Sequence, residues 1–339
     1  MAKLKDIANE LGLSPATVSR ALNGYPEVGE RTRERVREVA ARLGYAPNPI
    51  ARRLVGGRSG LVGMVVPKVG DVSVDPSFVE MVAGMSEALS AHDMDLVISV
   101  DTRADPRDTY KRLIERNTLD GFVVTAPLPD DPRLNLLRAA KIPFVVHGPG
   151  GADDDLYDID NYGAGRIAAE HLIGLGHRNI AFLNGPAHLA YAQDRRRGYE
   201  EAIRAASLDV NADLLWHDEP THSTGERLAD RLLDMGEDGR ATAILCSSTA
   251  IASGVYAAAE RRGLSVGEDL SVMAHDDAPP HIRAQDFRPP LTVTTSPLTD
   301  ACEPLAAMLA ARVSEPDAPV QQVVAGVDLV SRTSTGPLR

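Results

Sequence analysis

The sequence predicts an α/β protein. It has an N-terminal helix-turn-helix head of three helices, then a short helix, then two doubly wound α/β lobes. Three observations support this. Residues 1–45 carry apolar side chains at helical spacing, and from residue 61 strand-like runs alternate with amphipathic helices. The first 60 residues hold 11 Lys and Arg against 6 Asp and Glu, whereas the rest holds 25 against 42. A basic head on an acidic body indicates contact with phosphates, although a solvated arginine-rich face is the alternative.

The head contains start and stop signals for three short helices. The first, over residues 4–12, ends at Gly12. The second has Ser14 as N-cap, Pro15 at the first helical position and Asn23-Gly24 as its stop. The third covers roughly 30–43. Their inward apolar positions are Leu4, Ile7, Ala8, Leu11, Val18, Ala21, Leu22, Val36, Val39, Ala40 and Leu43. This is the helix-turn-helix plan, although spacing alone does not exclude a generic three-helix bundle.

The remaining chain divides into a short hinge and a long body. Residues 46–60 enclose a helix of barely two turns, which should form only when packed against something. Helices such as 77–92 and 162–176 separate the strands of the body. The expected strands are 61–67, 94–100, 120–126, 142–148, 179–185, 241–248, 270–277 and 291–296. Such sheets bind ligands beyond the carboxyl ends of their strands.

Common catalytic and membrane signatures are absent from the sequence. There is no GxxxxGK[ST] loop, GxSxG elbow or HExxH helix, and the glycine-rich stretch 148–152 is interpreted as a turn. Cys246 and Cys302 lack metal-site spacing. The tandem His275-Asp276-Asp277 is better explained by a polar ligand or a helix cap than by a metal. We therefore expect no metal, no cofactor, no enzymatic activity and, without an apolar signal or spanning segment, a cytoplasmic protein.

Several stretches together resemble the LacI-type bacterial repressors. They are LKDIANELGLSPATVSRALNG, VGERTRERVREVAARLGYAPNPIARRL, RSGLVGMVVP, DNYGAGRIAAEHLIGLGHRNIAFLNGP, RRRGYEEAI and LSVMAHDD. The resemblance covers essentially the whole chain. It implies a DNA-binding head over 1–46, a hinge helix and linker over 47–60, and a core over 61–339 like a periplasmic sugar-binding protein. Lobe 1 would comprise about 61–160 and 291–320, and lobe 2 about 161–290 and 321–339.

The resemblance also implies which head and hinge residues contact DNA. Pro15 and Ala16 occupy the main base-reading positions, where they offer only apolar contact, so hydrogen-bonded readout would shift to Arg20. Leu54 matches the wedge that opens a base step from the minor groove, unless it packs at the junction of head and body. The remaining expected contacts, to phosphates or groove walls, are Ser14, Thr17, Ser19, Asn23, Asn48, Ala51 and Arg52.

The effector site is implied at the strand ends of the body. Arg195 stands three residues before Gly198, like the ligand-gripping arginine of the family, and Asp276 follows a strand where a hydroxyl-binding aspartate belongs. The two would hold adjacent sugar hydroxyls, unless they pair with each other or with neighbouring side chains. Two departures alter the pocket: Ser248-Thr249 replaces an Asn-Asp pair and His147-Gly148 replaces Asp-Arg. Phe78 either stacks on the ligand or belongs to the core.

The predicted function is therefore a homodimeric regulator, a repressor released from a near-palindromic operator by a small carbohydrate. The VVHG and ILCSS segments resemble the branch of the family that senses α-glucosides and similar disaccharides. The main alternative keeps the architecture but uses a purine-like or other co-repressor that strengthens DNA binding. An enzyme or a transport receptor with a helical appendage is a further alternative. No membrane partner is expected.

Overall fold

The computed structural model describes residues 3–22, 25–45, 58–67, 76–101, 105–236 and 239–338. The chain forms two compact units, Met1–Ser59 and Gly60–Arg339. Of the described helices, none is long and apolar enough to cross a membrane.

The head is the predicted bundle of α1 (Leu4–Leu11), α2 (Pro15–Leu22) and α3 (Glu30–Arg42). Gly12 ends α1 in a left-handed conformation with φ of 65°. Ser14 begins α2, since its Oγ accepts a 3.0 Å hydrogen bond from the backbone N–H of Thr17. The three helices share a core made of Ile7, Ala8, Val18, Ala21, Val28, Val36, Val39 and Ala40.

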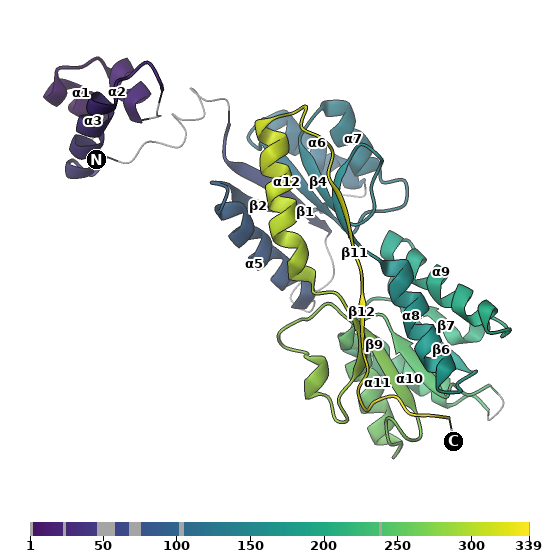
Figure 1. The fold of residues 1–339 in the computed structure, drawn as a ribbon. Coiled ribbons are helices and arrows are strands. Elements are labelled where there is room, and N and C mark those ends of the chain that lie inside the picture. Colours follow the sequence, from purple (N-terminus) through teal and green to yellow (C-terminus); the bar gives the residue numbers. More distant parts are fainter. Residues whose placement is uncertain are drawn as a thin grey trace. The chain divides into compact units, whose positions relative to one another are not determined.

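The first lobe of the core is built on a six-stranded sheet. Helices α5 (Pro76–Ser90) and α12 (Cys302–Ser314) share one hydrophobic cluster with this sheet, while α6 (Pro106–Arg116) and α7 (Pro132–Ala140) share another (Figure 1). The described pairs are all parallel. The strand order is β11 (Gln322–Ala325), β5 (Asp155–Ile159), β4 (Phe144–His147), β3 (Gly121–Thr125), β1 (Leu61–Pro67) and β2 (Asp95–Asp101).

The second lobe repeats this plan. Helices α8 (Asn161–Gly174) and α9 (Ala190–Ala205) cover one face of its sheet, and α10 (His222–Leu233) and α11 (Thr249–Arg261) cover the other. β12 is antiparallel to β10, and the other pairs are parallel. The strand order is β12 (Asp328–Val330), β10 (Thr292–Thr295), β9 (Ser271–Asp276), β8 (Ala243–Cys246), β6 (Ile180–Asn184) and β7 (Leu215–His217).

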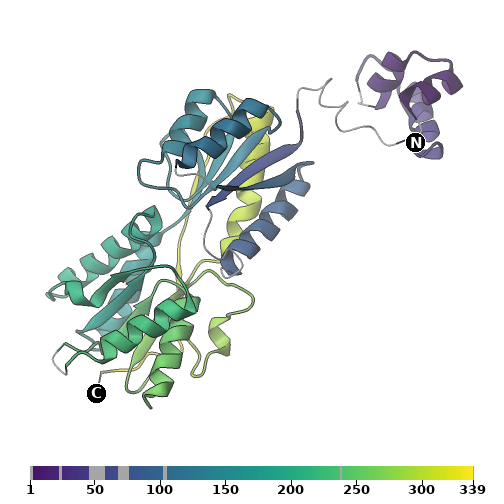
Figure 2. The same cartoon turned by 180° about the vertical axis from the view of Figure 1, so that it is seen from behind.

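The chain crosses between the lobes after β5, after β10 and after β11. Figure 2 shows the same two layered lobes of the core from behind. The predicted lobe boundaries were wrong at two of these crossings. Strand β10, over residues 292–295, belongs to the second sheet and not to lobe 1, and β11, over 322–325, belongs to the first sheet and not to lobe 2. The sheet to which each strand belongs is decided by backbone pairing with a strand that is distant in the sequence. The local pattern of residues does not indicate which strand that is.

Candidate functional site

Helix α2 presents an exposed face that carries the predicted DNA-reading residues. Val18 and Ala21 are fully buried and anchor the opposite face in the head. Ser14, Pro15, Ala16 and Arg20 are exposed, and Thr17 and Ser19 are half-buried; the Thr17 hydroxyl lies 2.8 Å from the Ser14 hydroxyl. With two apolar side chains at its start and one arginine in its last turn, this face offers hydrogen bonds to a base mainly through Arg20.

Five predicted DNA contacts lie outside the described residues: Asn23, Asn48, Ala51, Arg52 and Leu54. The side chain of Phe78, at the start of α5, is likewise outside the description. Their roles remain predictions from the sequence.

The core brings a polar cluster together where its lobes meet, which we call the inter-lobe site. Its members are His147 at the end of β4, Asn161 at the start of α8, Arg195 on α9, Ser247 after β8 and Asp277 after β9. The lobes touch beside it, because the first amide of α9, on Ala190, donates a 3.3 Å hydrogen bond to the carbonyl of Pro127, after β3.

Arg195 is the buried anchor of this site, with 6% of its surface exposed. Its Nε donates to Asn161 Oδ1 at 2.8 Å, and its Nη1 donates to the Ser247 carbonyl at 2.9 Å. The ring of Tyr191 lies beneath the guanidinium, 5.1 Å from its centre. Burial lowers the pKa of Arg195, and the charge of Asp277 opposes this. Two bonds therefore fix the guanidinium in place before any ligand arrives.

The charges of Asp277 and Asp158 act on Arg195, and no interaction between Arg195 and the predicted effector residue Asp276 is found among the described residues. Burial raises the pKa of Asp277, but His275 and the charges of Arg195 and His147 outweigh this and leave it lowered. Asp276 instead accepts a 2.8 Å hydrogen bond from the backbone N–H of Ala278, and burial raises its pKa. Neighbouring residues at a strand end point to opposite sides, which separates the two carboxylates. The only indication in the sequence that either aspartate could face Arg195 was that Asp276 and Asp277 are adjacent.

Histidine and aspartate side chains complete the electrostatics of the site. His275 Nε2 lies 3.3 Å from Asp277 Oδ1, and its Nδ1 lies 3.1 Å from the Thr294 hydroxyl. Burial lowers the pKa of His147 to about 4, while Asp277 opposes the shift. At neutral pH His147 is therefore uncharged and serves as a hydrogen-bonding group. Burial raises the pKa of Asp158 to about 6, with Asp194 and Asp160 adding to the shift and the charge of Arg195 opposing it.

Ser248 has a structural contact that the sequence did not predict. Its hydroxyl caps α11 by accepting a 3.2 Å hydrogen bond from the backbone N–H of Ile251. Its neighbour Ser247 meets Arg195 through the backbone, and the buried Ser247 Oγ has no hydrogen-bond partner among the described residues. An orphaned buried hydroxyl beside a fixed arginine is available to a polar ligand. Sequence reasoning missed Asn161, Ser247 and Asp277; the polar residues just after β5, β8 and β9 were the available signal.

No group of three or more His, Cys, Asp or Glu side chains is arranged to hold a metal ion within the described ranges. The inter-lobe site instead offers a fixed cation, a carboxylate, a neutral imidazole and a free hydroxyl. This combination suits a neutral molecule that is rich in hydroxyl groups, since such a molecule both donates and accepts hydrogen bonds.

Comparisons with known proteins identify the family of this chain. Residues 3–48 match the profile described as bacterial regulatory proteins of the lacI family, and residues 169–335 match a periplasmic binding protein-like domain. The chain is 39% identical to the HTH-type transcriptional regulator AglR of Rhizobium meliloti over 98% of its own length and 94% of that protein. The chain belongs to the lacI family. This member of the lacI family is a DNA-binding transcriptional regulator.

The chain is also similar to other transcriptional regulators, and the solved structures of two of them contain a small molecule. It is 36% identical to RafR of Escherichia coli, over 81% of this chain and 82% of that protein. The structure of a complex of the regulator CelR with cellobiose aligns at a TM-score of 0.72 and 27% identity, covering 98% of this chain and 100% of that one. The lac repressor dimer bound to operator and the anti-inducer ONPF aligns at 0.83 and 25% identity, covering 99% of both chains.

Proposed function

We propose that this regulator is a repressor that binds a near-palindromic operator as a homodimer and is released by a small carbohydrate, such as an α-glucoside or another disaccharide. It acts in the cytoplasm, where its operator lies, and it returns its ligand chemically unchanged. The observation that carries the effector proposal is the inter-lobe site. There Arg195 and Asp277 come from the second lobe and His147 from the first.

The donors and acceptors of the inter-lobe site match adjacent sugar hydroxyls. Arg195 donates, Asp277 accepts, and neutral His147 and the Ser247 hydroxyl do either. Hydrogen bonds to charged groups in a buried site are worth ~1.5–3 kcal/mol each. The complex of the relative CelR with cellobiose supports a disaccharide as the class of ligand.

A ligand held between the lobes can directly change their relative orientation. The bond between Ala190 N–H and the Pro127 carbonyl joins the lobes beside the site, and the crossings after β5, β10 and β11 allow them to move against each other. A sugar that binds one closure state more tightly shifts the population toward it. We propose that this shift reaches the hinge and lowers operator affinity.

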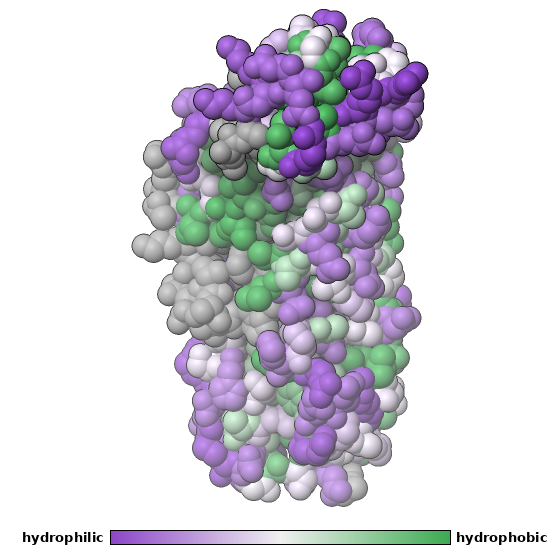
Figure 3. Space-filling view, turned by 90° about the vertical axis from the view of Figure 1, so that its left-hand side faces the viewer, coloured by the Kyte–Doolittle hydropathy of each residue, from purple (hydrophilic) through white to green (hydrophobic). Residues whose placement is uncertain are grey.

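The proposed dimer uses the outer face of the first lobe. Three large hydrophobic side chains are unusually exposed there: Val79 of α5 at 53%, and Ile98 and Val100 of the edge strand β2 at 43% and 48%. Figure 3 shows hydrophobic side chains gathered on this side of the lobe. A contiguous apolar patch of this kind favours association, and the lac repressor, which aligns over the whole chain, is a dimer on its operator.

The deciding experiment combines an operator with a sugar screen. A near-palindrome selected from random DNA should bind the protein far more tightly than its scrambled version, with steep salt dependence. Mono- and disaccharides are then screened for a rise in melting temperature, and any that stabilise the protein are added to the complex. The proposal expects release of the DNA. Equal affinity for scrambled DNA would contradict it, and a ligand that tightens operator binding would establish the co-repressor alternative.

A further inference from the structure

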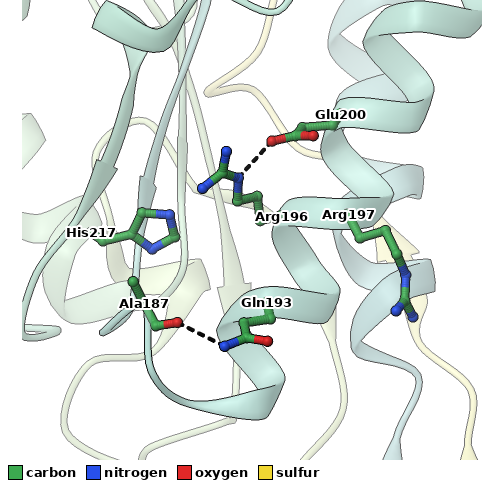
Figure 4. Close-up of a pocket in the computed structure, with 6 residues that line it drawn as sticks. All are labelled: Ala187, Gln193, Arg196, Arg197, Glu200 and His217. Atoms are coloured by element: carbon green, nitrogen blue, oxygen red, sulfur yellow. Dashed lines mark hydrogen bonds and ion pairs between the residues drawn. The ribbon is translucent and has the colours of Figure 1, made fainter. Parts of the chain in front are cut away.

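A cavity lies in the second lobe, lined by none of the residues of the inter-lobe site. It measures about 380 Å³ and is lined by Ala187, Gln193, Arg196, Arg197, Glu200 and His217 (Figure 4). These residues come from the loop after β6, from α9 and from the end of β7. Arg196 follows Arg195 directly, and consecutive helical residues point about 100° apart, so the two arginines serve different surfaces.

His217 supplies an unsatisfied acceptor at this cavity. Its Nδ1 lies 2.9 Å from the carbonyl oxygen of Gly185. Since a carbonyl only accepts, this contact selects the tautomer with its hydrogen on Nδ1, in which Nε2 is the acceptor. Nε2 is buried and has no hydrogen-bond partner in the described part of the chain. A buried polar atom without a partner is destabilising, so a hydroxyl group that donates to it would bind favourably.

Arg196 supplies the positive charge. Its Nε donates to Glu200 Oε1 at 2.5 Å, and Arg204 donates to the other oxygen of Glu200 at 2.7 Å. One carboxylate shared by two arginines leaves a net positive charge. The terminal nitrogens of Arg196 bond to no described residue, and Figure 4 shows them directed toward His217. Arg197 points away and pairs with Asp194 at 2.9 Å.

We propose that this cavity is a second ligand site, specific for a small oxyanion that also carries a hydroxyl group. The fork of Arg196 matches a phosphate or carboxylate, and His217 Nε2 accepts from a neighbouring hydroxyl. Gln193 closes the lower wall by donating to the Ala187 carbonyl at 3.1 Å. A sugar phosphate and a hydroxy acid share this chemistry, and the volume suits a molecule of monosaccharide size.

Calorimetric titration of the full-length protein tests the proposal with glucose 6-phosphate and malate as probes. Glucose and inorganic phosphate each supply only half of the required chemistry. We expect at least one probe to bind tenfold or more tightly than either half. Arg196→Gln removes the charge, and His217→Asn removes Nε2 while its amide can still donate to Gly185. Each should weaken binding about tenfold or more. Arg204→Gln is the matched control, because it takes the other arginine from Glu200 and leaves the cavity lining intact.

Three results would overturn the proposal. The first is that neither probe binds. The second is that Arg196→Gln and His217→Asn bind the probe as tightly as the unchanged protein does. The third is that Arg204→Gln loses as much affinity for the probe as these two variants. Binding by inorganic phosphate as tight as by the better probe would also refute it, since the hydroxyl would then contribute nothing. None of these results bears on the operator or on the inter-lobe sugar, because the variants leave Arg195, Asp277 and the head unchanged.

Discussion

The Nε of Arg195 donates to Oδ1 of Asn161 at 2.8 Å, which ties α9 to the first residue of α8. Asn161 in turn donates through Nδ2 to the Ile159 carbonyl at 3.0 Å, on the strand that leads out of the first lobe. Arg195 of the inter-lobe site is thus bonded to the chain at one of its crossings between the lobes. A ligand that contacts Arg195, as proposed, would act directly on this crossing.

Asn161→Ala should destabilise the core by ~1–3 kcal/mol, because it leaves the buried Nε of Arg195 without an acceptor. It should also lower the affinity for the sugar, since Arg195 loses one of the two hydrogen bonds that position it. Urea unfolding and sugar titration measure the two effects. Asn135→Ala is the control: Asn135 also accepts from an arginine, Arg138, but is exposed. Equal stabilities of the two variants would show that the Arg195 bond contributes little.

Asp277→Asn should reduce sugar affinity about ten- to hundredfold, the loss of one charge-assisted hydrogen bond of ~1.5–3 kcal/mol. Asp276→Asn should reduce it much less, because Asp276 is engaged by the Ala278 amide. Both variants should still occupy the operator in the absence of sugar. Titration of each with the sugar found in the screen compares the adjacent carboxylates directly. A larger loss of sugar affinity in Asp276→Asn than in Asp277→Asn would show that Asp276 is the residue that binds the sugar.

Acid should destabilise the core through His147. Its pKa is about 4 in the folded protein against 6.5 as the ordinary value, so the unfolded chain binds more protons between these limits. The stability that neutral His147 contributes is thus present above pH 6.5 and is lost as the pH falls toward 4, by at most ~1.4 kcal/mol per pH unit. Asp158 and Asp276, whose pKa values are raised, act in the opposite direction. The difference between wild type and His147→Gln in urea unfolding at several pH values isolates the histidine; a constant difference would contradict the prediction.

Gly165→Ala should disrupt the contact between α8 and α9. A Cβ at Gly165 would lie 2.0 Å from the backbone carbonyl oxygen of Arg195, so the helices must separate, at a cost of ~1–3 kcal/mol. Gly174→Ala is the control in the same helix, because its Cβ would meet nothing within 4 Å. That change should instead stabilise the core by ~0.5–1 kcal/mol through its better helix propensity. Thermal unfolding of both variants gives the comparison, and similar shifts would refute the packing argument.

Arg20→Ala should weaken specific operator binding by ~1–3 kcal/mol and relax sequence preference, because Arg20 is the exposed hydrogen-bonding side chain of α2. Binding to scrambled DNA should change less. The control is Arg42→Ala, which removes an arginine that pairs with Glu10 in the same head. Fluorescence anisotropy with both DNAs measures the effects. Equal losses on operator and scrambled DNA would assign Arg20 to the phosphates.

The sequence predictions were accurate for features that depend on residues close together in the sequence and poor for features that depend on distant residues. The strand-like runs and the first three helices were predicted to within a few residues, because periodicity and caps are local. The predicted strands omitted β5, β7, β11 and β12, which are short or polar. β11 and β12 lie at sheet edges, where only pairing with a distant strand defines them. The resemblance implied that Arg195 is an effector residue, which stays a prediction. Its bonds to Asn161 and Ser247 span 34 and 52 residues of sequence, so no local pattern could predict them.

The sequence by itself determined the helix-turn-helix head, the succession of strands and helices, and the membership of the lacI family. Each of these depends on residue types at short spacing, which the order of the chain contains. The tertiary structure alone decided that the charge of Asp277, and not that of Asp276, acts on Arg195, that β10 and β11 exchange lobes, and that His217 and Arg196 share a cavity. These facts depend on which side chains converge from distant segments, and convergence is set by the packing of whole sheets and helices.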